Sequence, residues 1–163
     1  MAAVDDILRS YRAPRAVVRA HFARRRSEGR VFSFLIAALI VILIGMWPEL
    51  ARQNYLAPEQ KMPVLVMGRA LALLATVPVF YALAALGPLI SKIFGGRGDW
   101  YGGRLSLFWA LFAVSPLMLL QGLVAGFIGD GPQLTAVSLV VFAVFLWFWL
   151  AGLTVTEFER EAP

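Results

Sequence analysis

The stretch VFSFLIAALIVILIGMW, from Val31 to Trp47, contains 17 consecutive residues without a charge. At about 1.5 Å per residue, a helix of this length reaches roughly across a hydrocarbon core about 30 Å thick. Hydrophobic residues make up 60% of the 163-residue chain, above the ~45–50% that is usual for a soluble domain. A single soluble core of this size could not bury so much apolar surface. The stretch therefore predicts a transmembrane helix.

Three further apolar runs, at residues 70–90, 105–128 and 134–155, also lack Asp, Glu, Lys, Arg and His. A charge at the centre of a span costs at least ~2.5 kcal/mol on insertion scales, so its absence favours complete spans. The runs are too long for the strands of a membrane barrel, and they do not alternate. Backbone groups in lipid must bond internally, so we expect helices. The fold class is an all-α integral membrane protein with a bundle of about four transmembrane helices over residues 31–155.

Basic residues are distributed unevenly around these spans. Eight of the 15 precede the first span, three lie between the first and second, three between the second and third, and one follows the fourth. The positive-inside rule places the basic-rich flanks in the cytoplasm. We therefore expect a multi-pass protein of the cell inner membrane with both termini cytoplasmic, in which residues 156–163 form a short cytoplasmic tail.

Residues 1–30 form a basic N-terminal segment. Asp5 and Asp6 can cap a first helix, and Pro14 suits the first turn of a second. Apolar residues then recur at helical spacing, which predicts an amphipathic helix lying on the inner leaflet. Three arginines of this helix are candidates for contact with anionic headgroups: Arg15, Arg19 and Arg24. The alternative is a solvated basic arm. Nucleic acid is not expected as a partner, because no recognised binding module surrounds the charges.

The residue types that catalysis needs are scarce. The chain has no cysteine, which excludes disulfides, thiolate chemistry and Cys-based metal sites. Its one histidine, His21, lies on the predicted surface helix, and no carboxylate lies within a span. A catalytic triad or proton relay inside the bilayer would lack its acid and base. We expect no catalytic residues, no metal, no cofactor and no enzymatic activity.

Arg69 is the charge nearest to a predicted span. The apolar run before it begins at Pro63, so Arg69 can lie inside the outer boundary of the second span. One interpretation is that its side chain snorkels to the headgroups. The other is that it contacts a lipid phosphate or a buried polar group.

Gln121 is the strongest polar residue well inside the third span, and Gly122 and Gly126 follow it as a G-x-x-x-G motif. Small residues at this spacing let helices approach closely, and an amide can bond across the contact. Packing within the bundle and contact with a second copy or another protein both remain open. Kinks are expected at three prolines of the second and third spans: Pro78, Pro88 and Pro116.

The connection between the second and third spans, IFGGRGDWYGGR from Ile93 to Arg104, is rich in glycine. It follows no strand and lacks the Gly-Lys-Ser/Thr ending of a phosphate-binding loop. Glycine supplies the positive φ angles of a tight connection between antiparallel helices, and aromatic rings can anchor such a turn at the membrane interface. The loop residues assigned to these roles are Gly95, Gly96, Arg97, Trp100 and Tyr101.

Two segments together resemble the bacterial branch of the YIP family. These are the proline-containing N-terminal segment SYRAPRAVVRAHFARR and the sequence FGGRGDWYGGRLSLFWALFAVSPLMLL. The resemblance covers roughly residues 8–153. Members of this family are small multi-span proteins, named for binding Ypt/Rab GTPases in eukaryotes, and they usually show five spans where this chain shows four. The resemblance implies a non-enzymatic protein that contacts membrane partners, without a catalytic residue set; a bacterial member has no such GTPase to bind.

Two functions follow as hypotheses. The first is a scaffold or accessory protein of the inner membrane that contacts anionic headgroups and other membrane proteins, or a second copy of itself. The second is an oligomeric transporter, channel or lipid-handling protein, in which Arg69 and Gln121 would line the path. Four spans are few for one transport pathway, so the second function would need assembly.

Overall fold

The structure, a computed structural model, describes residues 2–59 and 61–159 and is entirely helical over them apart from short connections. The elements are α1 (Ala2–Ser10), α2 (Pro14–Phe22), α3 (Glu28–Gly45), α4 (Trp47–Leu56), α5 (Met62–Ala75), α6 (Val77–Ile93), α7 (Trp100–Phe127), α8 (Pro132–Leu153) and the π-helical turn η1 (Thr154–Phe158). Within these residues, four stretches are long and apolar enough to cross a membrane: Glu28–Leu56, Met62–Ile93, Trp100–Phe127 and Pro132–Phe158. The prediction of an all-helical chain with four such helices is confirmed.

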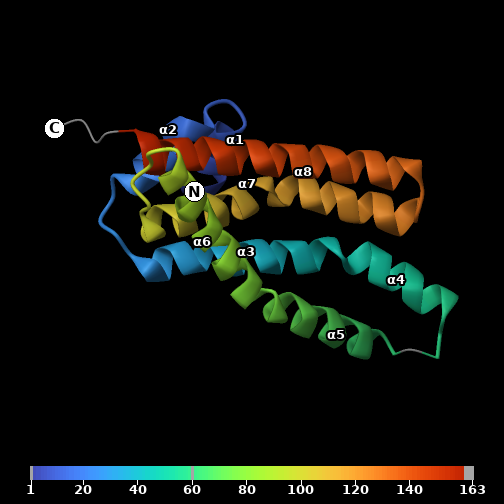
Figure 1. Ribbon diagram of the computed structural model, residues 1–163. Helices are drawn as coiled ribbons and strands as arrows, with labels where there is room; N and C mark the ends of the chain where they lie inside the picture. Colours follow the sequence, from blue (N-terminus) through green and yellow to red (C-terminus); the bar gives the residue numbers. More distant parts are fainter. Residues whose placement is uncertain (1, 60, 160–163) are drawn as a thin grey trace.

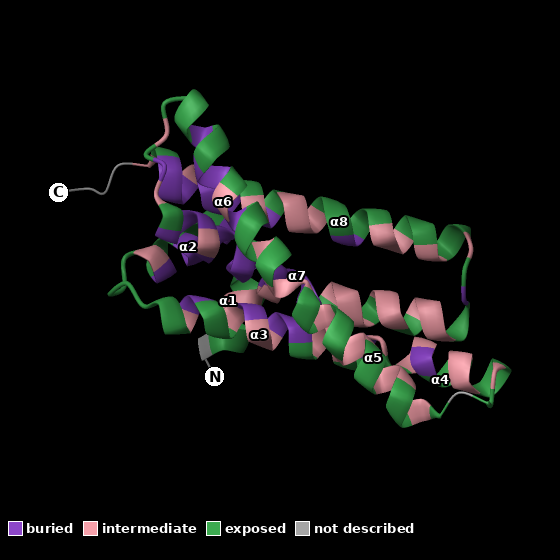
Figure 2. Cartoon of the chain, turned by 60° about the horizontal axis from the view of Figure 1, so that its bottom comes forward, coloured by how far each residue is buried: buried purple, intermediate pink, exposed green. Residues whose placement is uncertain are grey.

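Helix α7 lies at the centre of the bundle. It packs against α3 and α8 along much of its length, and α4 and α6 also contact it (Figure 1). In an apolar segment of 18 residues within α7, 50% of the residues are buried inside the chain. In the corresponding segment of the stretch made by α5 and α6, only 11% are buried. Figure 2 shows the same contrast, because α5 carries only exposed and intermediate residues. The fold is therefore a compact unit around α7 with one weakly covered span.

Two of the four long stretches break two residues before a proline. Helix α3 ends at Gly45 and α4 begins at Trp47, with Pro48 in its first turn; α5 ends at Ala75 and α6 begins at Val77, with Pro78 in its first turn. Proline lacks an N–H and cannot donate to the carbonyl four residues earlier, so the helical hydrogen-bond ladder is interrupted there. The break beside Pro78 agrees with the expected kink, whereas the sequence pattern did not indicate the break beside Pro48.

Helices α6 and α7 continue through Pro88 and Pro116 without a break. Each proline leaves the carbonyl four residues earlier without its helical partner. At Phe112, the Ser115 hydroxyl donates to that carbonyl at 2.8 Å. At Ala84, Gly103 of α7 approaches so closely that a Cβ built on it would lie 2.6 Å from the carbonyl oxygen. The Ser115 hydroxyl therefore satisfies the carbonyl freed by Pro116, and at Pro88 helix α7 packs closely against the freed carbonyl of Ala84.

We call the end of the bundle that carries α1, α2, residues 94–99 and η1 the terminal end. Helices α1 and α2 pack there across α7 and α8 (Figure 1). Val17 and Val18 are buried in a cluster with Trp109 and Phe148. The face of the N-terminal segment that we expected to lie on the lipid leaflet is therefore covered by the protein's own helices.

Two details of the terminal end correct the sequence expectations. Helix α1 begins at Ala2, so Asp5 and Asp6 lie inside the helix and do not cap it. Residues 156–158, expected in a tail, belong to η1, and Thr156 and Glu157 are buried. Residues 160–163, the remainder of that expected tail, lie outside the described residues, and they include Arg160, the one basic residue after the fourth span.

Candidate functional site

Residues 94–99 make a tight connection from α6 to α7 at the terminal end. Gly95 and Gly98 have φ angles of 80° and 69°, a left-handed conformation that glycine adopts without steric cost. Gly96 lies so close to α6 that a Cβ built on it would be 2.8 Å from the carbonyl oxygen of Ser91. The glycines therefore provide the tight connection between antiparallel helices that the sequence indicated.

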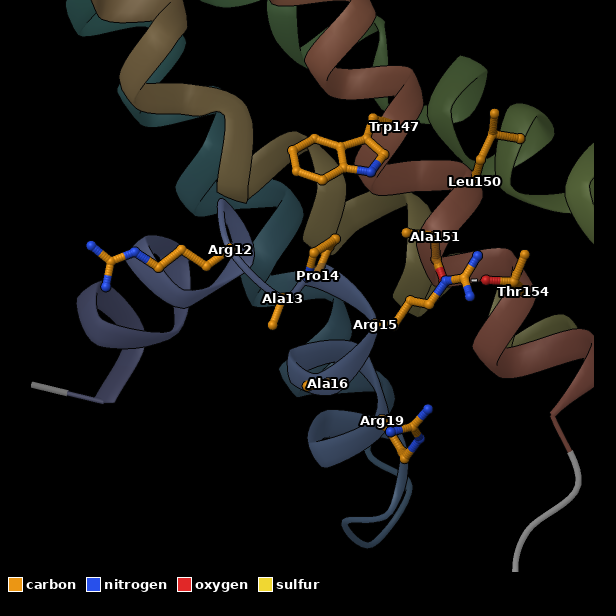
Figure 3. Close-up of a pocket in the computed structure, with 10 residues that line it drawn as sticks. All are labelled: Arg12, Ala13, Pro14, Arg15, Ala16, Arg19, Trp147, Leu150, Ala151 and Thr154. Atoms are coloured by element: carbon orange, nitrogen blue, oxygen red, sulfur yellow. Dashed lines mark hydrogen bonds between the residues drawn. The ribbon is translucent and has the colours of Figure 1, made fainter.

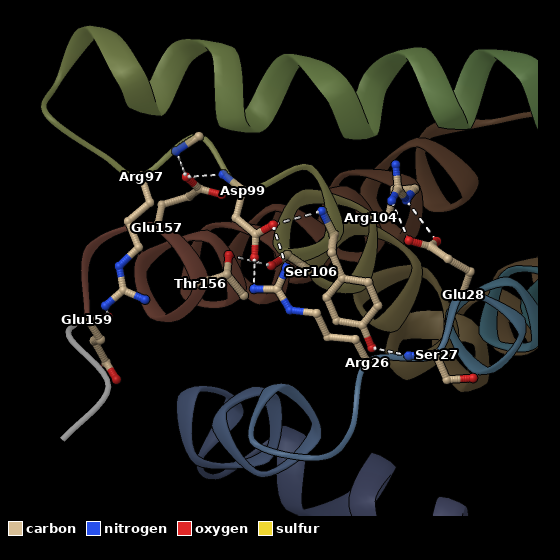
Figure 4. A network of polar contacts seen from close by, with 12 residues as sticks. Arg26, Ser27, Glu28, Arg97, Asp99, Arg104, Ser106, Thr156, Glu157 and Glu159 are labelled. Atoms are coloured by element: carbon tan, nitrogen blue, oxygen red, sulfur yellow. Dashed lines mark hydrogen bonds and ion pairs between the residues drawn. The ribbon is translucent and has the colours of Figure 1, made fainter. Parts of the chain in front are cut away.

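This connection holds a carboxylate of the same chain (Figure 4). The amide of Gly98 donates to Oε2 of Glu157 at 2.6 Å, and the amide of Asp99 donates to the same oxygen at 3.3 Å. The amide of Arg97 donates to the carbonyl oxygen of Glu157 at 3.1 Å. Hydrogen bonds to an ionised acceptor are about twice as strong as neutral ones. The loop therefore binds the C-terminal end of the bundle through its backbone.

Asp99 joins the same loop to the N-terminal segment. Its side chain caps α7 by accepting from the amide of Tyr101 at 3.2 Å, and it forms an ion pair with Arg26 at 2.9 Å. The Tyr101 hydroxyl accepts from the amide of Ser27 at 3.3 Å and from the guanidinium of Arg30 at 3.2 Å. Tyr101 is only 5% exposed, so the expectation that it anchors the loop at the membrane interface is wrong.

Three further contacts link the same segments. Arg104 of α7 pairs with Glu28 at the start of α3, and Arg19 of α2 pairs with Glu159. Arg97 donates to the carbonyl oxygen of Glu159. Exposed ion pairs individually contribute little, but here they connect three segments that are far apart in the sequence. These contacts thus join the N-terminal segment to the glycine-rich loop and to the C-terminal end, and together they form one polar surface.

His21 lies in the interior of the terminal end and not on an open surface helix. It is 3% exposed, and its ring lies 4.4 Å from that of Trp109 and 5.3 Å from that of Phe34. Its Nε2 is 3.3 Å from Oδ2 of Asp6, without hydrogen-bond geometry. Burial lowers the pKa of His21, and Arg24 lowers it further, while Asp6 acts in the opposite direction. The imidazole is therefore held mainly neutral at pH 7.

The G-x-x-x-G motif of α7 packs inside the chain. A Cβ built on Gly122 would overlap the backbone of Gly45 and lie 2.6 Å from its carbonyl carbon. A Cβ on Gly126 would lie 2.6 Å from the carbonyl carbon of Pro48. Of the two interpretations left open by the sequence, the close approach is the one to the chain's own α3 and α4. The space beside these glycines is not free for a partner.

Gln121 and Arg69 face different neighbours. Gln121 donates to the hydroxyl of Ser138 on α8 at 2.9 Å. Arg69 lies 3.7 Å from Oε1 of Glu49 on α4, and among the described residues its guanidinium donates no hydrogen bond. The side chain of Arg69 is 42% exposed. The two residues that a transport path would require are therefore engaged at separate helix pairs.

The three arginines assigned to headgroup contact also differ in their surroundings. Arg15 and Arg19 line a groove between α2 and α8 together with Arg12 (Figure 3). Arg24 is exposed beyond the end of α2 and is not part of that groove. Trp100 remains on the surface at 46% exposure, with the ammonium of Lys92 5.8 Å from its ring centre. Of the three arginines predicted to contact headgroups, only Arg15 and Arg19 thus lie at the same groove.

Sequence patterns did not reveal the residues that organise this end, above all Glu157, Asp99 and the pair His21–Asp6. Asp99 had a usable signal, because an aspartate directly before a long apolar helix is a typical N-cap. Glu157 and His21 had none, because each depends on contacts with segments distant in sequence. Within residues 2–59 and 61–159, no group of three or more His, Cys, Asp or Glu residues is placed to hold a metal ion. Comparison of the chain with protein-family models, curated proteins and solved structures finds no match.

Proposed function

We propose that this chain is a non-enzymatic, YIP-like protein of the inner membrane that acts as a scaffold or accessory subunit, with both termini in the cytoplasm. The resemblance of residues 8–153 supports the family assignment, and the excess of basic residues at the terminal end supports the orientation. Its partner is a transmembrane helix of another membrane protein. The observation that carries this role is the exposure of the span made by α5 and α6.

Helix α5 has no buried residue, although it lies within a stretch apolar enough to cross a membrane. Its main contacts within the chain are with α3, α4 and α6, and it diverges from α7 and α8 (Figure 1). Helices in lipid associate through close packing and interhelical hydrogen bonds, since lipid tails remove the hydrophobic driving force. A span that packs little on its own chain retains that packing surface for another helix.

One face of α5 has the features of such a contact. Gly68 and Ala72 are exposed one turn apart, and nothing lies within 4 Å of the position where a Cβ on Gly68 would be. This is the small-x-x-x-small spacing of close helix pairs, and unlike Gly122 and Gly126, Gly68 has open space beside it among the described residues. Arg69 lies beside this face, and among the described residues its guanidinium N–H groups donate no hydrogen bond. A partner helix with an acceptor at this level would complement both the shape and the charge.

The absence of cysteine from the sequence makes a direct test possible. Single-cysteine variants Ala72→Cys and Ala143→Cys would each carry a thiol-directed photocrosslinker in native membranes. Both positions are exposed, Ala72 on α5 and Ala143 on α8. We expect the Ala72 probe to form a discrete adduct with another membrane protein and the Ala143 probe to label lipid alone.

A matched pair of substitutions tests the same contact without a probe. Ala72→Leu adds a bulky side chain to the proposed face, and Ala143→Leu makes the same change on α8. We expect Ala72→Leu to abolish co-purification of the crosslinked protein and Ala143→Leu to retain it. Equal labelling from both probes, or retention of the protein by Ala72→Leu, would exclude this face as the contact. An adduct with a second copy of the chain would replace the accessory role with self-association.

A further inference from the structure

A groove of about 560 Å³ lies between α2 and the terminal end of α8 (Figure 3). One wall is formed by the start of α2 and the residues before it, and the other by one face of α8. Its lining residues are Arg12, Ala13, Pro14, Arg15, Ala16, Arg19, Trp147, Leu150, Ala151 and Thr154. The groove combines three arginines with an apolar helix face, and no acidic residue among residues 2–59 and 61–159 lines it.

The positive charge of the groove is concentrated at its mouth. Figure 3 shows the side chain of Arg15 extending from α2 toward Thr154, the last residue of the α8 wall, with Arg19 further along α2 and the side chain of Arg12 pointing away from α8. Arg19 is paired with Glu159 at 2.6 Å, so this arginine is partly neutralised. Among the described residues Arg15 forms no ion pair. The mouth therefore keeps a net positive charge available to an anion.

The α8 wall becomes apolar toward the interior of the span. Trp147, Leu150, Ala151 and Thr154 follow one another at helical spacing on a single face. Trp147 and Leu150 are 47% and 57% exposed, and the three residues from Trp147 to Ala151 that line the groove carry no charge. A tryptophan at this depth is typical of the boundary between headgroups and acyl chains. The groove is thus positively charged at the end that carries Arg15 and apolar at the end that carries Trp147. A phospholipid has the matching arrangement, with a polar headgroup and apolar acyl chains.

We propose that this groove binds an anionic phospholipid, with the headgroup phosphate at Arg15 and Arg19 and an acyl chain along Leu150 and Trp147. Arginine presents a planar set of donors that matches phosphate oxygens. A second, apolar groove of about 510 Å³ between α6 and α8 shares Leu150 and Thr154 with the first, so a second acyl chain has a surface on the other side of Leu150. This site is independent of the proposed contact at α5.

The full-length protein in detergent micelles, mixed with equal amounts of phosphatidylglycerol and phosphatidylcholine, provides the test by native mass spectrometry. We expect the protein to retain phosphatidylglycerol in preference to phosphatidylcholine. Arg15→Gln should weaken phosphatidylglycerol retention about fivefold, the effect of one arginine at an anionic surface, and Arg15→Gln with Arg19→Gln should weaken it further. Arg25→Gln removes the same charge from the same basic segment outside the groove, and should leave retention unchanged.

Two additional measurements distinguish lipid binding from a loss of folding and from the binding of a soluble anion. Thermal unfolding of each variant shows whether it is folded, and Arg15→Gln is expected to match the parent because Arg15 is exposed. Inorganic phosphate added as a competitor should not displace the lipid, because only the lipid contacts the α8 wall. Equal loss of phosphatidylglycerol from Arg15→Gln and Arg25→Gln would show a general basic attraction and overturn the site. Displacement by inorganic phosphate would replace the lipid with a soluble anion.

Discussion

The side-chain carboxylate of Glu157 accepts a hydrogen bond of 2.6 Å from the backbone amide of Gly98, 59 positions earlier in the sequence. Gly98 can present this amide because its φ is positive, a conformation that a side chain would strain. The contact joins the end of the fourth span to the connection between the second and third. It explains why a glycine-rich loop that resembles an anion-binding loop occurs in a chain without such a motif: the anion is the protein's own carboxylate.

Replacement of Glu157 should show how much this contact stabilises the terminal end. Glu157→Leu removes both acceptors and leaves the amides of Gly98 and Asp99 unpaired, so we expect the free energy of unfolding to fall by about 1–3 kcal/mol. Glu157→Gln keeps one acceptor oxygen and should cost less. Unfolding in nanodiscs measures both effects, and proteolysis at residues 94–99 should increase in the same order. Equal stability of Glu157→Leu and the parent protein would show that the contact does not fasten this end.

Methyl groups added at different glycines should have opposite effects. Gly122→Ala would place a Cβ against the backbone of Gly45, and overpacking of this kind costs about 1–3 kcal/mol. Gly68→Ala has open space and replaces glycine in a helix with a better helix former, so it should be neutral or stabilising by up to about 1 kcal/mol. Thermal unfolding of the two variants provides the comparison. If Gly122→Ala were as stable as Gly68→Ala, α7 would not approach α3 as closely as described.

Gln121 should contribute to stability and not to transport. Gln121→Leu removes the hydrogen bond to Ser138, and such bonds between membrane helices contribute about 0.6 kcal/mol on average and up to about 1.7. We expect a loss of stability in this range and no change in the flux of any solute through proteoliposomes. Loss of a measurable flux without loss of stability would favour the transport alternative.

The burial of His21 makes the terminal end sensitive to acid. Because burial lowers its pKa in the folded protein, the unfolded chain takes up the proton first as pH falls below about 6.5, the ordinary value. The free energy of unfolding should therefore decrease as pH falls from about 6.5 through the lower pKa of the folded state, and stay constant above about pH 7.5. His21→Phe should remove this dependence. An unchanged slope between about pH 5 and 7 in His21→Phe would assign the effect to other groups.

The four long helices were predictable because their apolar runs contain no charge, and in lipid the helix satisfies every internal backbone group. Their ends were less predictable. Helix α4 extends the first stretch to Leu56 although it contains Glu49 and Arg52. Helix α5 begins at Met62, beside the earlier start at Pro63 that the sequence allowed and before the start at residue 70. Hydropathy marks the part of a helix that can lie in hydrocarbon, whereas its helical geometry can continue into a polar region.

The polar arrangement of the terminal end was not predictable in the same way. The positions of Glu157 and Tyr101 depend on which helices become neighbours, and no periodicity in the sequence encodes that choice. The sequence motif Gly122–Gly126 did indicate a close helix contact, but it could not identify α3 and α4 as the other side. Tyr101 was misjudged for a related reason, because an aromatic ring before a span fits both an interface and a buried helix start.

The mass of the particle in native nanodiscs tests the proposed scaffold role most directly. The chain alone has a mass of 18.0 kDa. We expect a reproducible particle that contains this chain together with a different membrane protein, and we expect the second protein to be lost from Ala72→Leu but not from Ala143→Leu. A particle whose protein mass is 18.0 kDa, or a whole multiple of it, under conditions that preserve native lipids would contradict the accessory role.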